Sequence, residues 1–325
     1  MERVFSGIQP TGVLHLGNYL GAVRNWVAIQ SDYECIYCVV DLHAVTQSYD
    51  VAAMPGRILE LATGLLACGL DATQVRLFVQ SSLPQHAELA WVFTCVTSMG
   101  ELGRQTQFKS KSEQQADNIN VGLFAYPVLQ AADILLYKAS RVPVGEDQEQ
   151  HLELSREIAR RFNARFGATF PEPRTLFTST PRIRGLDGAA KMSKSLGNHI
   201  AVDEDEAVLR RKLASAVTDP ARQKRADPGH PEICNIYSLH KFFSDSGSCQ
   251  EIESACRTAA IGCVDCKKRL GDQLLAHFAP IRERWRTLRE RPDEVRDVLR
   301  QGQRQCQQLA DATMAEVRAK MGLNW

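Results

Sequence analysis

The run Lys191-Met192-Ser193-Lys194-Ser195 indicates a chemistry through its residue types and spacing. Two ammonium groups three positions apart, with hydroxyl groups beside them, can bind the oxygens of a polyphosphate when a mobile loop closes over it. Leu196-Gly197-Asn198 follows and extends the loop. A solvated loop rich in lysine and serine has the same composition, so the interpretation depends on the rest of the chain.

A second candidate phosphate-binding segment lies near the amino terminus. Residues 3 to 8 predict a short strand, and Gln9-Pro10-Thr11-Gly12 supplies a turn after it. Apolar residues then recur at helical spacing, which places His15-Leu16-Gly17-Asn18 in the first turn of a helix. Unsatisfied N–H groups at such a helix start, beyond the carboxyl end of a strand, attract phosphate. A histidine there is alternatively a capping or surface residue.

Together the two segments resemble the paired signatures of class I aminoacyl-tRNA synthetases, an HIGH-like tetrapeptide and a KMSKS loop about 175 residues later. Four further strings resemble the bacterial type of tryptophanyl-tRNA synthetase, namely Phe5 to Gly12, Val40 to Ala44, Ala131 to Leu135 and Val144 to Gln148. The resemblance covers essentially the whole chain. It implies a ligase that activates L-tryptophan with ATP to tryptophanyl-adenylate and pyrophosphate, and then transfers tryptophan to tRNA(Trp).

The order of the predicted elements indicates the fold. Strand and helix patterns alternate over the first 200 residues, with the apolar run Cys35 to Val40 typical of a parallel strand covered on both faces. Charged, helix-forming stretches follow at 204–216, 250–261, 265–289 and 293–320. We therefore predict an α/β fold, a doubly wound parallel sheet of the Rossmann-like class I synthetase kind, with an all-helical second domain.

The same pattern suggests two domains. Residues 1–202 are expected to form the ATP and tryptophan catalytic domain, ending in the KMSKS loop. Residues 203–325 are expected to form the helical domain that binds the tRNA anticodon, with a last helix able to pack back on the catalytic domain.

The charge balance and the lack of long apolar runs limit how the chain can bind nucleic acid or membranes. The 325 residues include 39 Lys and Arg against 38 Asp and Glu, so nucleic acid must be bound by local patches and not by a global basic field. There is no apolar run of membrane length and no secretory pattern at the start, so we expect a cytoplasmic protein with no membrane contact.

The implied reaction needs no Ser, Cys or His nucleophile, because the carboxylate of tryptophan attacks ATP and the departing pyrophosphate carries the charge to be stabilised. By resemblance this task falls to Lys191, Lys194, Ser193, Ser195, Lys111 and Gln9. The other ATP contacts implied are Pro10, Thr11, His15, Gly17, Asn18, Gly145, Glu146, Asp147, Ile183 and Met192. Acidic residues in a first helical turn are also favoured by the helix dipole alone. Mg²⁺ is expected to arrive with ATP, held mostly by phosphates and water.

Tryptophan recognition requires an acceptor for a buried indole N–H. Asp133 is the candidate, since it lies in the apolar stretch Val128 to Leu136, where an unpaired carboxylate would be costly. An isolated aspartate in such a helix is alternatively a satisfied structural residue. The remaining pocket residues implied by the resemblance are Phe5, Gly7, Gln9, His43, Tyr126, Val142, Val144 and Gln148.

The cysteines suggest a metal site. Ten cysteines without a secretory signal argue against a disulfide framework, and Cys35 and Cys38 on one strand are expected in the core. Cys234, Cys256, Cys263 and Cys266 give C-x21-C-x6-C-x2-C, which suits tetrahedral zinc or a [4Fe–4S] cluster, with Cys249 outside the pattern. A subset of tryptophanyl-tRNA synthetases similar to this chain carries a cluster at nearly this spacing. We therefore expect a [4Fe–4S] cluster, with zinc or no metal as alternatives.

The resemblance also implies a homodimer. A candidate surface for the tRNA backbone comprises Lys267, Lys268, Arg269, Arg282, Arg284, Arg286 and Arg289, although each is equally consistent with a solvated helix face. Three other functions compete: a tyrosine-specific synthetase, a small-molecule nucleotidyltransferase of the same fold, and an iron–sulfur RNA-binding or regulatory protein with an inactive catalytic domain. The retained phosphate ligands and the KMSKS loop favour the synthetase.

Overall fold

The structure, a computed structural model, describes residues 1–104, 119–144, 149–177, 183–194 and 196–324. The chain forms two compact units. The sheet unit contains Met1–Gly12, Arg24–Thr180 and Leu288–Trp325, and the helical unit contains Val13–Val23 and Pro181–Thr287. This division differs from the expected one at residue 202, because backbone hydrogen bonds join the segment around Leu14 to the segment around Val202.

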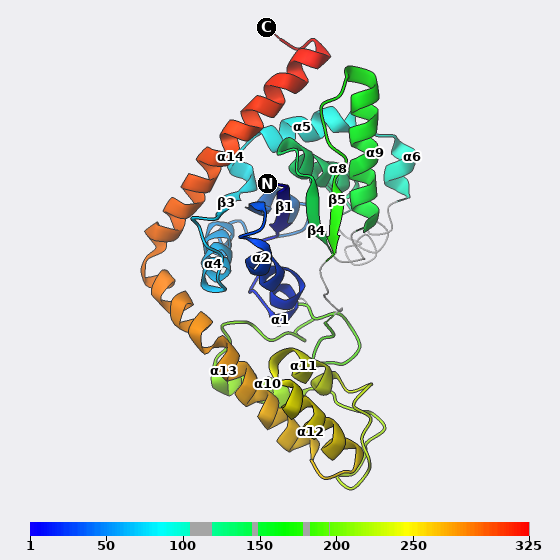
Figure 1. The fold of residues 1–325 in the computed structure, drawn as a ribbon, viewed down its shortest axis with the longest axis vertical. Coiled ribbons are helices and arrows are strands. Elements are labelled where there is room, and N and C mark those ends of the chain that lie inside the picture. The colour runs from blue at the N-terminus through cyan, green and yellow to red at the C-terminus, as the bar shows by residue number, and fades with distance from the viewer. Residues whose placement is uncertain (105–118, 145–148, 178–182, 195, 325) are drawn as a thin grey trace. The chain divides into compact units, whose positions relative to one another are not determined.

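The sheet unit is built on five parallel strands in the order β3-β2-β1-β4-β5 (Figure 1). They are β1 (Arg3–Ile8), β2 (Glu34–Val39), β3 (Val75–Val79), β4 (Arg141–Val144) and β5 (Arg174–Phe177). Val4 pairs with Cys35 and Val39 pairs with Val79. The predicted doubly wound parallel sheet is confirmed, whereas β5 was not predicted because its two apolar residues, Leu176 and Phe177, are adjacent and give neither an apolar run nor an alternation.

The helices of the sheet unit lie between these strands in sequence, except α14, which follows all of them (Figure 1). They are α2 (Arg24–Ile29), α3 (Asp41–Ala44), α4 (Met54–Ala67), a 3₁₀ turn η2 (Gln80–Ser82), α5 (Gln85–Thr94), α6 (Met99–Gly103), α8 (Val121–Leu136), α9 (Glu149–Phe166) and α14 (Pro292–Met321). Because α8 and α9 pack on each other and α5 packs on α8, they bury a continuous apolar layer against the sheet.

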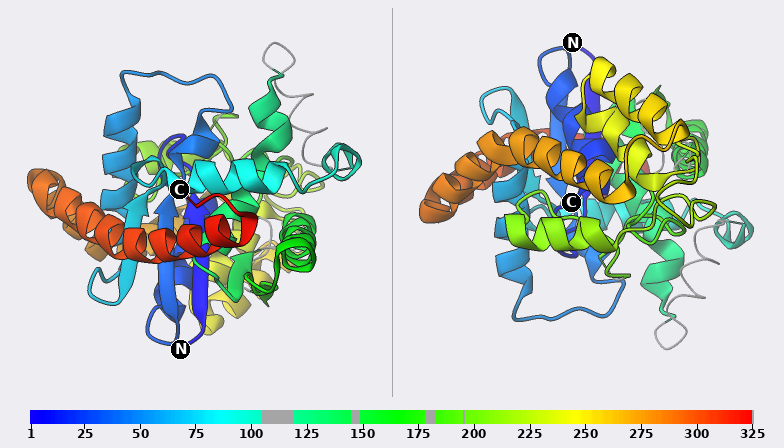
Figure 2. Two further views of the ribbon diagram at one scale, coloured as in Figure 1. Left: turned by 90° about the horizontal axis from the view of Figure 1, so that it is seen from above. Right: turned by 90° about the horizontal axis from the view of Figure 1, so that it is seen from below.

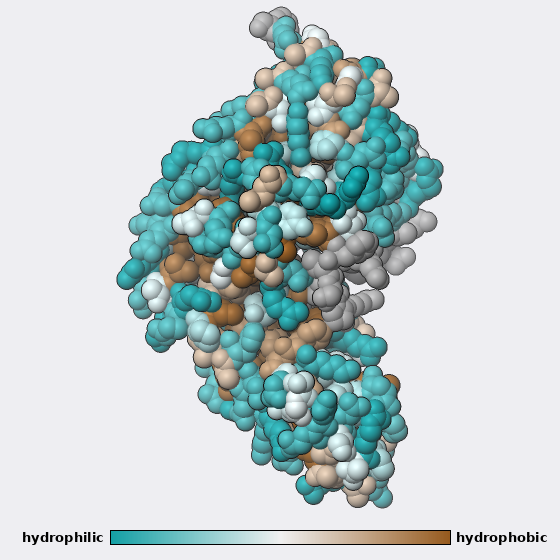
Figure 3. All heavy atoms as spheres, in the orientation of Figure 1, coloured by the Kyte–Doolittle hydropathy of each residue, from teal (hydrophilic) through white to brown (hydrophobic). Residues whose placement is uncertain are grey.

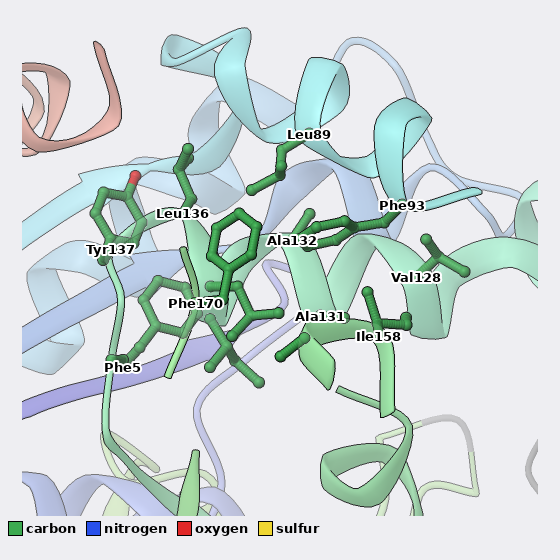
Figure 4. Close-up of a cluster of buried hydrophobic side chains, with 14 of the residues drawn as sticks. Phe5, Leu89, Phe93, Val128, Ala131, Ala132, Leu136, Tyr137, Ile158 and Phe170 are labelled. Atoms are coloured by element: carbon green, nitrogen blue, oxygen red, sulfur yellow. The ribbon is translucent and has the colours of Figure 1, made fainter. Parts of the chain in front are cut away.

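Aromatic rings fill this layer (Figure 4). Phe5 stacks on Tyr137 with ring centroids 5.6 Å apart, and Phe93 meets Phe170 edge to face at 5.2 Å. Cys35 and Cys38 of β2 are both buried, as expected for core residues. The layer therefore holds the start of β1 and the end of α8 in fixed positions.

The last helix covers the edge of the sheet. α14 runs alongside β3 and α4 (Figure 2). The approach is possible because position 302 is glycine: a Cβ there would lie 2.0 Å from the carbonyl oxygen of Leu77 in β3. An edge strand covered in this way is not open to pairing with another chain.

The helical unit contains α1 (Leu16–Asn18), a π-helical turn η1 (Tyr19–Val23), α10 (Glu206–Ser215), α11 (Asn235–Phe243), α12 (Ser246–Arg257) and most of α13 (Cys263–Glu290). The predicted helical stretches are present, and α11 is an addition. Among the described residues, no helix has both the length and the apolar character needed to cross a membrane. Hydrophilic residues cover most of the face drawn in Figure 3.

Candidate active site

His15 caps the short helix α1. Its Nδ1 accepts the backbone N–H groups of Gly17 at 3.1 Å and Asn18 at 3.4 Å, while Asn18 Oδ1 accepts the N–H of His15 at 3.3 Å. This is the reciprocal arrangement that Ser or Thr and Glu make in a capping box. The capping role considered for His15 is therefore present, and it orders the turn that carries Gly17 and Asn18.

The HIGH-like segment and the KMSKS segment lie side by side in the helical unit. The N–H of Leu16 donates to Ile200 O at 2.9 Å, and the N–H of Val202 donates to Leu14 O at 2.9 Å. A Cβ on Gly17 would lie 3.6 Å from Cβ of the buried Met192. Met192 in turn donates its N–H to Ile183 O at 3.0 Å. The structure thus brings together Gly17, Met192 and Ile183, three of the residues that the sequence assigned to the ATP site.

The side chain of Asn198 forms hydrogen bonds with the backbone of the KMSKS segment. Its buried side chain accepts the N–H of Ser193 at 2.7 Å and donates to Asp187 Oδ2 at 2.7 Å and to Lys191 O at 3.3 Å. The side chains of Lys191 and Lys194 are exposed. The sequence placed Asn198 in the extension of the loop without giving it a role, although a buried amide beside a basic loop is the kind of residue that fixes loop conformation.

Burial keeps the imidazole of the cap uncharged. It lowers the pKa of His15 to about 4, with further lowering by His199 and Lys191. The His199 ring lies 6.0 Å from that of His15, and its Nδ1 is buried without a partner among the described residues. At neutral pH His15 therefore retains the lone pair that its cap requires.

Asp133 is the centre of a buried polar network in the sheet unit. Its Oδ2 lies 2.7 Å from Nε2 of His43, and its Oδ1 accepts from Gln80 Nε2 and from His86 Nδ1, each at 2.7 Å. Burial alone would raise the pKa of Asp133, but His43 and His86 hold it below its ordinary value. The carboxylate is thus ionised and acts only as an acceptor.

Other predicted pocket residues lie in the same unit as this carboxylate. The ring of Tyr126 meets His43 edge to face at 6.3 Å, and Val142 is buried. Gly7 is needed in β1, because a Cβ there would lie 2.6 Å from Cγ1 of Val40. Gln80 and His86 were not predicted; both lie soon after the end of β3, where ligand-contacting residues of α/β folds gather.

Several predicted residues lie outside the described part of the chain. These are Lys111, Gly145, Glu146, Asp147, Gln148 and Ser195, together with the side chain of Val144. Gln9, Pro10 and Thr11 are described and follow directly after β1 in the sheet unit.

The four cysteines of the predicted metal site line one pocket in the helical unit. Cys234 precedes α11, Cys256 lies in α12, and Cys263 and Cys266 lie in the first turn of α13. Burial raises the pKa of the Cys266 thiol to about 12, so the bare thiol is protonated at neutral pH. Among the described residues, no group of three or more His, Cys, Asp or Glu side chains is arranged to hold a metal ion.

Arg222 lies against the same pocket. Its Nη1 is 3.9 Å from Sγ of both Cys256 and Cys263, and its Nη2 donates to Ile261 O at 2.9 Å. Its Nε is buried with no partner in the described part of the chain. Cys249 points elsewhere, with its Sγ 3.4 Å from His240 O.

Comparison with known proteins assigns the family. The family described as tRNA synthetases class I (W and Y) matches residues 1–279, so the chain belongs to that family. Tryptophan–tRNA ligases of Deinococcus radiodurans and Thermotoga maritima are 51% and 45% identical, each over 99% of this chain and 99% of the relative. Within the family the chain therefore belongs to the tryptophan–tRNA ligases, as its sequence signatures predicted.

Solved structures agree with this assignment. The tryptophanyl-tRNA synthetase of Campylobacter jejuni complexed with ADP and tryptophan superposes with a TM-score of 0.89 at 34% identity, over 98% of this chain and 99% of that chain. The enzyme of Mycoplasma pneumoniae gives 0.84 at 32% identity, over 100% and 98%. The fold and the ligase class are thus confirmed, and tryptophan is favoured over the tyrosine alternative.

Proposed function

We propose that the chain joins L-tryptophan to tRNA(Trp) in two steps: it activates tryptophan with ATP to tryptophanyl-adenylate plus pyrophosphate, then transfers tryptophan to the tRNA. The observation that supports this most directly is the backbone hydrogen bonding between the segments around Leu16 and Ile200. It places the HIGH-like and KMSKS segments in the same unit. The test is ATP–pyrophosphate exchange with tryptophan and with tyrosine. Exchange that depends on tyrosine alone, or no exchange, would defeat the proposal.

In the activation step the carboxylate of tryptophan attacks the α-phosphorus of ATP and pyrophosphate leaves. Lys191, Lys194 and Lys111 neutralise the charge that develops on the leaving group, with Ser193 and Ser195 as additional donors. Lys191 and Lys194 are exposed and flank Ser193, whose backbone is held by Asn198, and this supports their role. Mg²⁺, general for class I synthetases, would be held mostly by phosphate oxygens and water.

The remaining ATP contacts come from two regions. We assign Gln9, Pro10 and Thr11 after β1, together with His15, Gly17 and Asn18 at α1, to ATP binding. The absence of a side chain at Gly17 supports this assignment, because a Cβ there would meet the His15 ring at 2.9 Å and Cβ of Met192 at 3.6 Å. The N–H groups of Gly17 and Asn18 are themselves accepted by His15 Nδ1. Gly145, Glu146, Asp147 and Ile183 complete the proposed set.

We assign recognition of the indole N–H to Asp133. An ionised carboxylate has about four acceptor positions, and three are occupied by His43, Gln80 and His86. One position is therefore left for an incoming donor. The proposed wall of the pocket consists of Phe5, Gly7, Gln9, His43, Tyr126, Val142, Val144 and Gln148.

We further propose that Cys234, Cys256, Cys263 and Cys266 hold a [4Fe–4S] cluster. Supporting observations are the convergence of four sulfur atoms on one pocket and the buried Arg222 Nε without a partner there. When bound, the cluster would cross-link three helices of the helical unit. Iron content and visible absorption of anaerobically prepared protein test this.

The tRNA surface and the homodimer remain proposals. Of the seven basic residues predicted to face tRNA, Arg269 pairs with Glu251, Arg286 with Glu283 and Arg289 with Glu60. Exposed pairs of this kind contribute little stability, so they can open toward phosphate. Trp91 and Met99 are large apolar side chains exposed in the sheet unit, which supports a homodimer. Sedimentation equilibrium distinguishes the dimer from a monomer.

A further inference from the structure

A chain of three buried polar groups runs inward from the proposed indole acceptor. His86 Nδ1 lies 2.7 Å from Oδ1 of Asp133, and His86 Nε2 lies 2.7 Å from the hydroxyl of Tyr137. Asp133 is 2% exposed, and His86 and Tyr137 are both 0% exposed. All three groups are therefore shielded from bulk water.

The chemistry of the end groups sets the direction of these hydrogen bonds. An ionised carboxylate only accepts, so Nδ1 of His86 must donate to Asp133. A neutral imidazole then has a lone pair at Nε2, and the Tyr137 hydroxyl must donate to it. Burial raises the pKa of Tyr137 well above its ordinary value, so the proton that it donates is retained. Asp133 thus sets the tautomer of His86, and the Tyr137 hydroxyl supplies the donor that this tautomer requires at Nε2.

Aromatic packing fixes both rings. Phe78 stacks on His86 with centroids 5.7 Å apart and 29° between the ring planes. Phe5 stacks on Tyr137 with 13° between the planes, and Figure 4 shows both side chains inside the core. Because neither ring can turn, the donor at His86 Nδ1 has a single direction.

The fixed donor of His86 determines which oxygen of Asp133 can accept a further hydrogen bond. Its Oδ1 receives two donors, from His86 and Gln80, whereas Oδ2 receives one, from His43. The free acceptor position is therefore on Oδ2, on the side of His43. A carboxylate without the His86 bond could rotate or take up a proton, and a protonated carboxyl would no longer demand a donor from the substrate.

We propose that His86 and Tyr137 are positioning residues for tryptophan recognition, which hold Asp133 as an ionised acceptor in one orientation and thereby set the selectivity for a ring that carries an N–H. The inference rests on the proposed role of Asp133. A site built around a buried acceptor rejects a ligand without the matching donor far more strongly than an apolar pocket rejects a change of size.

The test compares L-tryptophan with β-(benzothiophen-3-yl)-L-alanine, in which sulfur replaces the indole N–H. We measure kcat/KM for each in ATP–pyrophosphate exchange. Tyr137→Phe should reduce the preference for tryptophan by about tenfold or more, mainly through a higher KM for tryptophan with the KM for ATP unchanged. His86→Asn keeps a donor toward Asp133 but cannot receive the Tyr137 proton, so it should lose less.

Tyr37→Phe is the matched control. Tyr37 is equally buried, and its hydroxyl donates to Trp26 O at 3.2 Å without contact to Asp133. Its removal should lower thermal stability and leave the preference for tryptophan unchanged. Thermal unfolding of all three variants shows that each is folded at the assay temperature.

The results distinguish a failure of the positioning role of His86 and Tyr137 from a failure of the role of Asp133. An unchanged preference in Tyr137→Phe and His86→Asn, with stability losses like that of Tyr37→Phe, would show that the chain is structural only and overturn the inference. A wild-type enzyme that does not prefer tryptophan over the sulfur analogue would overturn the role of Asp133 itself, and with it the inference.

Discussion

Asn198 and Ser193 are joined by a 2.7 Å hydrogen bond from the Ser193 N–H to the Asn198 side-chain oxygen. The same amide donates to Asp187 and to the carbonyl of Lys191, so one buried side chain holds the backbone of the lysine-bearing loop at Lys191 and Ser193. The loop that should act on pyrophosphate is thus anchored at its base while its lysine side chains stay exposed.

Asn198→Ala should slow adenylate formation by about tenfold to a hundredfold, because the lysines lose their fixed base while tryptophan binding is unaffected. Single-turnover formation of the adenylate and the Kd for tryptophan measure the two effects. Asn163→Ala is the matched control, since its amide also makes three loop hydrogen bonds, to Thr169 and Phe170. If the control slowed the chemical step as much, a general loss of stability would be the cause.

Lys194→Ala should reduce the rate of adenylate formation by about a hundredfold or more, since a charge that stabilises the departing pyrophosphate is removed. The Kd for tryptophan should change little. Lys224→Ala, which removes another exposed lysine of the helical unit, should be neutral. Equal losses in rate and in tryptophan affinity would mean that the loop is wrongly assigned to the leaving group.

His15 should make stability depend on pH. Its folded pKa of about 4 lies below the ordinary value of 6.5, so between these values the unfolded chain binds a proton that the folded chain does not. Stability is therefore lost as pH falls from about 6.5 toward 4, by about 1–2 kcal/mol at pH 5 from this group. His15→Asn keeps a capping side chain that does not titrate. Its unfolding midpoint should fall less between about pH 7 and pH 5 than that of the wild type; an equal fall would contradict the role of His15.

Gly302→Ala should destabilise the protein by about 2–4 kcal/mol, because the added methyl group collides with the Leu77 carbonyl and displaces α14 from β3. Gly56→Ala is the control in another helix of the sheet unit. Its Cβ would meet nothing within 4 Å, so helix propensity alone should stabilise the protein by about 0.5–1 kcal/mol. Chemical denaturation measures both changes, and effects of equal sign would show that the packing of α14 is looser than described.

Cys263→Ser should abolish the visible absorption and the bound iron expected for a cluster. If the cluster braces the helical unit for tRNA, charging of tRNA(Trp) should fall while tryptophan-dependent pyrophosphate exchange is retained. Cys249→Ser, outside the pocket, is the control and should keep both iron and charging. Loss of iron with normal charging would refute the bracing role.

Local pattern was sufficient for most elements of the fold. Four of the five strands and the long helices follow from apolar periodicity, since burial of one face imposes that period wherever the chain runs. β5 was missed because its two apolar residues, Leu176 and Phe177, are adjacent and show neither an apolar run nor an alternation. The residues of the HIGH-like and KMSKS segments were found because each is a compact string with recognisable chemistry.

The sequence by itself determined the class of enzyme, the strand and helix order, and Asp133 as the candidate acceptor, because all of these are encoded over short stretches of chain. Only the tertiary structure identified His86 and Tyr137 as partners of Asp133, Asn198 as the anchor of the lysine loop, and Gly302 as the point where α14 meets the sheet. Such contacts join elements far apart in sequence, and their geometry depends on how those elements pack, which no local pattern of residues records.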